Sequence, residues 1–283
     1  MTLQDIIGQI KQKKTVLSIG LDPVIERMPE HIRASKDPLF EFNKAIVDAT
    51  HDLAIAYKPN TAFYEAYGHK GWESLEKTAF YIKENYPEMF LIADAKRGDI
   101  SHTSAMYAKA FFENMPFDAV TLTPYLGRDV AQPFLEYDGK WVILVGLSSN
   151  PSAWDIQLIQ EIETRDYIFE KIFKYGSWWG DENKVMFVAG ATLAYKLQQI
   201  RHIVPKHFLL VPGIGAQGGN LEEVCQFGMN ENYGLIINSS RSIIYAGEGE
   251  DFARKAREKA AEYSNAMKEQ IEKNNQRKSR RRR

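Results

Sequence analysis

Short apolar runs recur along the chain and alternate with longer amphipathic stretches. Eight such runs are rich in β-branched residues and mostly end in a polar residue or a glycine; they begin at Thr15, Leu53, Phe90, Asp118, Lys140, Lys184, His207 and Tyr233. A continuously apolar run is typical of a strand that is buried on both faces, as in a parallel sheet. We therefore expect eight parallel strands.

The stretches between these runs carry apolar residues three and four positions apart, which is the spacing of one buried helix face. Asp37 is suited to cap a helix that starts with Pro38. A second helix is expected over 73–86, because Pro87 marks its end. Further helices are predicted near 103–112, 129–137, 165–175, 193–203, 221–227 and 251–273.

Eight strands that are each followed by a helix favour an α/β fold, a single-domain (β/α)8 TIM barrel over residues 1–273. The alternative is an open doubly wound sheet. That fold favours a glycine fingerprint after the first strand, whereas the first run here ends in GLDP.

Composition restricts the class of protein and its compartment. Of the 283 residues, 44% are hydrophobic and 26% charged, which is the balance of a globular protein. The single cysteine, Cys225, cannot form an intrachain disulfide and fits a reducing compartment. No apolar run approaches the ~20 residues needed to cross a bilayer, and the charged N-terminus lacks the apolar core of an export signal. We expect a cytoplasmic protein with no membrane partner.

The net charge of −1 conceals a basic C-terminus. The last seven residues, RKSRRRR, carry six positive charges, and the net charge without them is −7. Residues 274–283 are therefore predicted to form a disordered tail. Such a tail either contacts nucleic-acid phosphates or stays solvated; we favour the second interpretation and do not expect nucleic acid as a partner.

Charged residues stand at the ends of three predicted strands. The first run ends in Asp22 and the second in Lys58, and the third contains Asp94 and Lys96. Side chains alternate along a strand, so Asp94 and Lys96 point the same way. At the C-terminal end of a barrel, where chemistry occurs, inward charges are costly unless paired. We expect either an ion-pair network that closes the barrel or a lysine held cationic to stabilise a carbanion.

A phosphate site is predicted after the seventh and eighth strands. The glycine-rich sequence VPGIGAQGG spans residues 211–219 and precedes a predicted helix, so backbone N–H groups can approach an anion. Arg241 follows the eighth strand and can contact phosphate with two N–H groups. Taken separately, the glycine run also fits a plain tight loop, and Arg241 a surface ion pair.

Other candidate chemistry is weaker. Ser148 and Ser149 can donate to a polar heterocycle, although a serine before Asn-Pro is also an ordinary turn signal. The six histidines have no metal-ligand spacing. The sequence contains neither a P-loop nor a nucleophile-elbow motif. We expect no metal and no cofactor.

Seven motifs together resemble one known family. They run in order from Leu21 to Ala246, and they are GLDP, YKPN, DAKRGDI, LSSNP, GAT, VPGIGAQGG and NSSRSIIYA. This series resembles the orotidine 5′-phosphate decarboxylases, in particular their longer bacterial branch (type 2). The resemblance implies a homodimeric TIM barrel that converts orotidine 5′-monophosphate to UMP and carbon dioxide in de novo pyrimidine biosynthesis, without a cofactor.

The resemblance also implies residue roles. Lys96 would protonate the ring carbon, Asp94 would lie beside the substrate carboxylate, and Lys58 and the partner's Asp99 would complete a charged array. The remaining substrate contacts would be Asp22, Lys58 and Asn60 at the ribose, Ile100 and Thr103 across the dimer interface, Ser148 and Pro212 at the pyrimidine, and Gln217 and Arg241 at the phosphate. Ser240 stands where many members have glycine.

Two alternatives remain open at this point. A magnesium-dependent sugar-phosphate decarboxylase or aldolase on a related barrel would use the same D-x-K-x-x-D spacing. A nucleotide- or RNA-binding protein would act through the basic tail.

Overall fold

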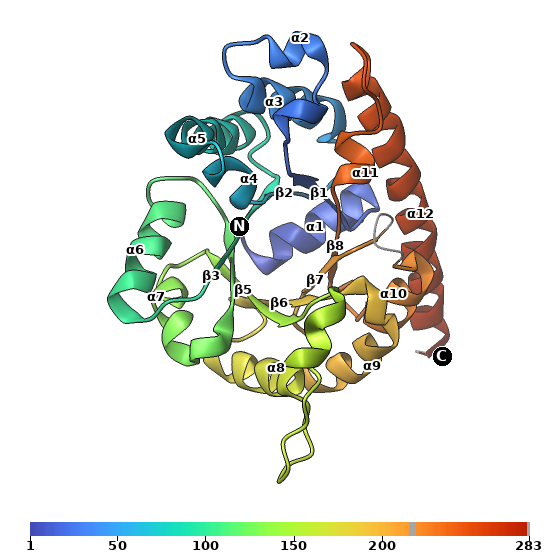
Figure 1. The fold of residues 1–283 in the computed structure, drawn as a ribbon. Helices are drawn as coiled ribbons and strands as arrows, with labels where there is room; N and C mark the ends of the chain where they lie inside the picture. The colour runs from blue at the N-terminus through green and yellow to red at the C-terminus, as the bar shows by residue number, and fades with distance from the viewer. Residues whose placement is uncertain (215–218, 282–283) are drawn as a thin grey trace.

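The eight apolar runs form the eight strands of a closed parallel barrel (Figure 1). The computed structural model describes residues 1–214 and 219–281. The strands are β1 (Leu17–Leu21), β2 (Ala56–Pro59), β3 (Phe90–Arg97), β4 (Ala119–Leu122), β5 (Trp141–Leu147), β6 (Val185–Ala189), β7 (Leu209–Pro212) and β8 (Leu235–Ser239). Each strand pairs with its neighbours in chain order, and β8 closes on β1. The predicted TIM barrel is therefore confirmed.

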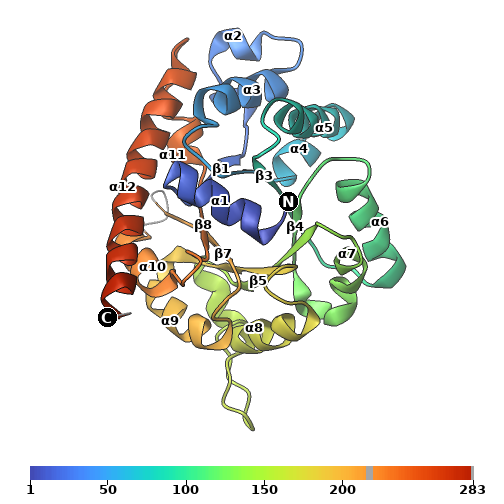
Figure 2. The same cartoon turned by 180° about the vertical axis from the view of Figure 1, so that it is seen from behind.

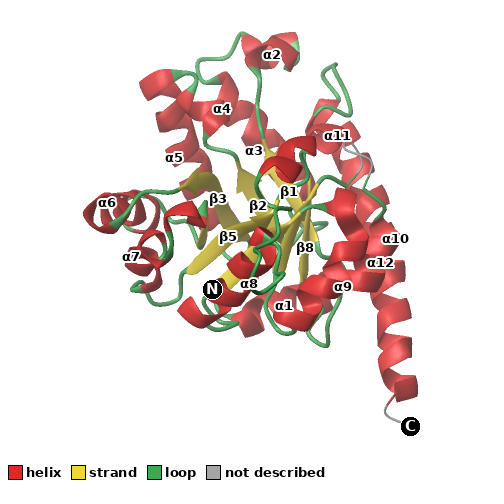
Figure 3. Ribbon diagram, turned by 60° about the horizontal axis from the view of Figure 1, so that its bottom comes forward, coloured by secondary structure: helices red, strands yellow, loops and turns green. Residues whose placement is uncertain are grey.

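Helices surround the strands in the described part of the chain (Figure 3). They are α1 (Leu3–Lys13), α2 (Glu30–Arg33), α3 (Pro38–Thr50), α4 (Ala62–Glu65), α5 (Gly68–Asn85), α6 (Ser101–Phe112), α7 (Gln132–Leu135), α8 (Ile168–Trp179), α9 (Ala194–Ile203), α10 (Leu221–Gly228), α11 (Arg241–Ile244) and α12 (Phe252–Arg281). Asp37 caps α3 as expected, since its side chain accepts a hydrogen bond from the N–H of Phe40. The helix predicted over 129–137 is shorter in the structure, where α7 consists of only four residues.

The barrel strands are apolar on both faces because both faces are covered. Every residue of β1 and β6 is buried, and the helices supply large core side chains such as Phe42, Phe111 and Phe173. Burial of one such side chain contributes roughly 1.5–3 kcal/mol. This double coverage explains the continuous apolar runs from which the strands were predicted.

Helix α1, which was not predicted from the sequence, covers the N-terminal end of the barrel (Figure 2). Ile6, Ile7 and Ile10 bury its inner face. The indole N–H of Trp141, at the start of β5, donates to the carbonyl of Met1 over 2.8 Å. The end of the barrel where the strands begin is therefore occupied by packing.

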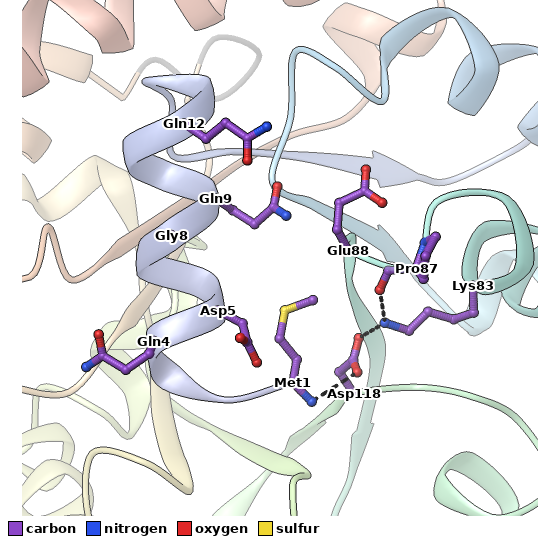
Figure 4. A pocket seen from close by; sticks show the side chains of 10 residues that line it. All are labelled: Met1, Gln4, Asp5, Gly8, Gln9, Gln12, Lys83, Pro87, Glu88 and Asp118. Carbon is purple, nitrogen blue, oxygen red and sulfur yellow. Dashed lines mark hydrogen bonds and ion pairs between the residues drawn. The ribbon is translucent and has the colours of Figure 1, made fainter.

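A cavity of about 480 Å³ lies beneath α1 (Figure 4). Its wall includes Lys83 and Asp118, which form an ion pair of 2.6 Å. Asp118 also accepts a 2.9 Å hydrogen bond from the N–H of Leu91. Asp118 precedes β4 and thus lies at the opposite end of the barrel from the charged strand ends. Its carboxylate already has partners that hold the helices and strands together.

Helix α12 extends past residue 273, the predicted end of the folded domain. It lies beside α3, α10 and α11, and Lys273 pairs with Glu222 of α10 over 3.0 Å. Within residues 1–214 and 219–281, no helix has the length and apolar character needed to cross a bilayer.

Candidate active site

Two lysines share one carboxylate at the C-terminal end of the barrel. The Lys58 ammonium on β2 lies 2.6 Å from Oδ2 of Asp94, and the Lys96 ammonium lies 2.5 Å from Oδ1. The Lys58 and Asp94 side chains are only 5% and 10% exposed, whereas that of Lys96 is 50% exposed. The charges predicted to pair at the strand ends do so, and Lys96 is the member that solvent or a ligand can reach.

The arrangement keeps Asp94 and Lys58 charged. Burial opposes ionisation of the Asp94 carboxyl, but Lys58 and Lys96 outweigh that effect and hold its pKa well below the usual range. Burial likewise disfavours the Lys58 ammonium, but Asp94 and Asp22 outweigh it and raise its pKa. Because opposite charges lie within about 4 Å, each stabilises the charged form of the other.

A cavity of about 160 Å³ opens beside this cluster. Residues from the ends of five strands or from the loops that follow them line it: Asp22, Lys58, Asn60, Asp94, Pro212, Gly213, Ile214, Asn238, Ser240, Arg241 and Ser242. Seven of these were predicted as site residues from the sequence. The parallel register explains the convergence, since the carboxyl ends of all strands meet at one end of a barrel.

Asp22 is anchored on one oxygen only. The Ser240 hydroxyl donates to its Oδ2 over 2.6 Å and contacts the carbonyl of Gly20 at 3.2 Å. Among the described residues, Oδ1 of Asp22 is buried and has no hydrogen-bond partner. Asp22 lines the cavity, and its Oδ1 keeps an acceptor position that no described residue fills. Gly20 is needed here because a Cβ would lie 2.7 Å from that of Ser240.

The predicted phosphate end is described in part. Arg241 is the first residue of α11, is exposed, and forms no ion pair with any described residue. Gly213 follows β7 with a φ of 101°, a left-handed conformation that favours glycine. The predicted contact Gln217 lies outside the described residues. The cavity therefore has a cationic end formed by Arg241.

Three predicted residues lie on the surface near α6 and do not line the cavity. Asp99 accepts a hydrogen bond from the N–H of Ile100 over 2.8 Å. Within the described residues of this single chain, Lys58 and Lys96 pair with Asp94, and no ion pair joins either of them to Asp99. Ile100 is 45% exposed, and Thr103 is exposed as well. Their expected role across a dimer interface stays a prediction.

Ser148 is held by a residue that the sequence did not reveal. Its hydroxyl and N–H contact Gln157 at 2.8 Å, and its hydroxyl also donates to Asn150 over 2.6 Å. Ser149 also has a partner. The role of Ser148 at a pyrimidine stays a prediction, because neither serine lines the cavity beside Asp94.

Two further polar residues that lie on strands were missed. Asn238, on β8, lines the cavity and accepts a hydrogen bond from Ser18 over 3.1 Å. Thr121, on β4, donates to Asp94 over 3.1 Å. Each is a polar residue inside an apolar strand, which is the signal that could have identified it. In the part of the chain that is described, no three His, Cys, Asp or Glu side chains are grouped to hold a metal ion.

Replacement of Asp94 should destabilise the protein in a pH-dependent way. Asp94→Asn leaves buried Lys58 without its counter-charge, so we expect a loss of about 3 kcal/mol in the free energy of unfolding at pH 7. The folded-state pKa of Asp94 is depressed. Its stabilisation is therefore fully present above the unfolded-state pKa near ~3.9 and is lost as pH falls from there through the folded-state pKa.

Denaturant unfolding between pH 3 and pH 8 measures this effect. The control is Asp52→Asn, which removes a partly exposed pair with Arg257 and should cost about 1 kcal/mol or less. Equal stability of Asp94→Asn and the unaltered protein at pH 7 would contradict the account.

Comparison with known proteins agrees with this geometry. Residues 15–256 match the model of the "Orotidine 5'-phosphate decarboxylase / HUMPS family". The chain is 54% identical over 272 residues to an orotidine 5′-phosphate decarboxylase of Flavobacterium johnsoniae, covering 96% of this chain and 99% of that one. It is 55% identical over 271 residues to one of Bacteroides fragilis, with 96% and 98% covered. The structure of Leishmania donovani OMP decarboxylase is similar, with a TM-score of 0.79, 31% identity, and 95% and 99% covered. The chain therefore belongs to the orotidine 5′-phosphate decarboxylase / HUMPS family.

Proposed function

We propose that this protein is an orotidine 5′-phosphate decarboxylase that converts orotidine 5′-monophosphate to UMP and carbon dioxide. The observation that carries the proposal is the Asp94 carboxylate between the ammonium groups of Lys58 and Lys96, beside a cavity with Arg241 in its wall. Family membership and the names of relatives about 55% identical support the same reaction. The proposed place of the reaction is the cytoplasm, in de novo pyrimidine biosynthesis.

The chemical difficulty is a carbanion that develops on a ring carbon with little delocalisation. An ammonium group that is already in position stabilises this charge without reorienting in the transition state. In the proposal, Lys96 performs this role and then gives its proton to the carbon. Asp94 fixes the ammonium and lies beside the substrate carboxylate until carbon dioxide leaves.

The rest of the substrate supplies binding energy that holds the ring in place. Arg241 suits the phosphate because guanidinium pairs with phosphate through two N–H groups. Asp22, with one free oxygen, suits a ribose hydroxyl, and Lys58 and Asn60 adjoin it in the cavity wall. Pro212 is proposed to border the pyrimidine.

Replacement of Lys96 tests the assignment directly. In an absorbance assay with orotidine 5′-monophosphate, Lys96→Ala should lower kcat at least about 10³-fold, because the variant lacks the ammonium that stabilises the carbanion and donates the proton. Each tenfold loss corresponds to ~1.4 kcal/mol of lost transition-state stabilisation. The matched control is Lys77→Ala. Lys77 is similarly exposed (45%) and is also paired with carboxylates, but on the surface of α5, so its removal should leave kcat within twofold.

Two outcomes would refute the proposal. One is failure of the unaltered protein to convert orotidine 5′-monophosphate. The other is retention of more than a tenth of its rate by Lys96→Ala. The same assay with a chelator separates the alternative, since a magnesium-dependent sugar-phosphate enzyme would lose activity and the proposed enzyme would not.

We also propose a homodimer in which Asp99, Ile100 and Thr103 reach the partner's site. Asp99 lies two residues before α6, and no described cationic side chain of its own chain forms an ion pair with it. The exposed side chain of Ile100 beside it offers apolar contact area. A twofold axis would give each site the same contribution from the opposite chain.

Mixing two inactive variants tests this sharing. One chain carries Asp94→Asn with Lys96→Ala, and the other carries Asp99→Asn. Random exchange of subunits makes half of the dimers hybrids, and each hybrid has one intact site out of two. We therefore expect roughly a quarter of the activity of the unaltered protein. Absence of rescue in a hybrid dimer that mass spectrometry has verified would exclude a shared site.

A further inference from the structure

Strand β3 loses its regular register with β4 at the catalytic segment. Ala93 pairs with Val120 and Arg97 pairs with Leu122. Residues 94–96 of β3 therefore lie opposite a single residue of β4, Thr121. Such a bulge re-aims side chains and leaves backbone groups without their ladder partners.

Lys96 has an unusual backbone conformation within this bulge. Its φ is 44°, in the left-handed region that residues other than glycine rarely adopt. A strained conformation of this kind persists only where neighbouring groups hold it. The backbone of Lys96 thus needs a specific partner.

Thr121 supplies that partner. The N–H of Lys96 donates to Oγ1 of Thr121 over 2.9 Å, and the same hydroxyl donates to Oδ1 of Asp94 over 3.1 Å. A hydroxyl group has one proton to donate and lone pairs to accept, so both bonds can exist together. Thr121 is completely buried, so bulk solvent does not reach its hydroxyl.

The Thr121 hydroxyl therefore contacts both the backbone of Lys96 and the carboxylate of Asp94. Oδ1 of Asp94 accepts from Thr121 and from the Lys96 ammonium, while Oδ2 accepts from Lys58. These contacts fix the rotation of the carboxylate about its own axis. The Lys96 side chain is thereby held at its backbone by Thr121 and at its ammonium by Asp94.

We propose that Thr121 is a positioning residue that directs the Lys96 ammonium by holding its strained backbone and the Asp94 carboxylate through one hydroxyl. The proposal rests on the decarboxylase function for its kinetic consequence only. Thr121 does not line the cavity, so its loss should affect the reacting groups more than the binding of ribose and phosphate.

The kinetic test uses Thr121→Val, which keeps the shape of the side chain and removes the hydroxyl. We expect kcat to fall at least 30-fold while KM changes less than threefold, because remote binding is retained. Thr121→Ser restores the hydroxyl and should recover at least a third of the original kcat. Equal kcat in Thr121→Val and the unaltered protein, or failure of serine to restore activity, would overturn the proposal.

Thr78→Val is the matched control. Thr78 is also a buried threonine whose hydroxyl donates one hydrogen bond, to Ser74, and accepts one, from Asn43. It touches neither Asp94 nor Lys96. Its replacement should lower thermal stability as Thr121→Val does, but kcat should stay within twofold. A matching fall in kcat would mean that Thr121 is merely structural.

Crystal structures of the variants test the geometry whatever the substrate. In Thr121→Val we expect Lys96 to leave the left-handed region and its ammonium to move away from Asp94, and in Thr121→Ser we expect neither change. If Thr121→Val does not fold, Thr121→Ala replaces it in both tests. An unmoved Lys96 would overturn the inference, whereas an inactive but correctly folded unaltered protein would refute the decarboxylase function alone.

Discussion

The active end of this barrel depends on one buried carboxylate that is shared by two ammonium groups. Asp94 binds Lys58 with one oxygen and Lys96 with the other. The buried charges of Asp94 and Lys58 would each be costly alone, and each stabilises the ionised form of the other. Lys58 and Asp94 are buried in the cavity wall, whereas Lys96 is half exposed and is not among the residues that line the cavity, so its ammonium is fixed next to the wall by Asp94.

The fold supplies what this charge cluster requires. Three parallel strands, β2, β3 and β4, bring Lys58, Asp94 and Thr121 together because their carboxyl ends meet at the same end of the barrel. Next to β2 in the closed sheet, β1 and its neighbour β8 bring Asp22, Ser240 and Arg241 to the same cavity. Packing by α1 occupies the far end. One end therefore provides stability, and the other end provides the chemistry.

The strands could be predicted from the sequence because they are buried on both faces, which leaves an uninterrupted apolar signature. The pairing of Asp94 with Lys96 also followed from side-chain alternation, although the structure forms this pair within a bulge. The bulge itself, the left-handed Lys96 and the partner Thr121 depend on register between β3 and β4, which hydrophobicity does not specify. The same holds for Gln157, whose contact with Ser148 depends on how its loop folds.

Helix ends were less predictable than strands. Pro38 and Asp37 gave a definite start to α3, because a cap and a first-turn proline are local signals. Helix α12 continues to Arg281 through a segment whose charge density indicated a tail. Arginine and lysine are themselves good helix formers, so a basic composition does not mark where a helix ends.

A crystal structure of the protein with UMP bound tests the central claim most directly. The account predicts that the Lys96 ammonium contacts the ring carbon from which the carboxylate would have left, at about 3–3.5 Å, with the phosphate bound by Arg241. A pyrimidine bound away from Lys96, or a Lys96 ammonium directed away from the ring while Asp94 keeps its partner Lys58, would contradict it.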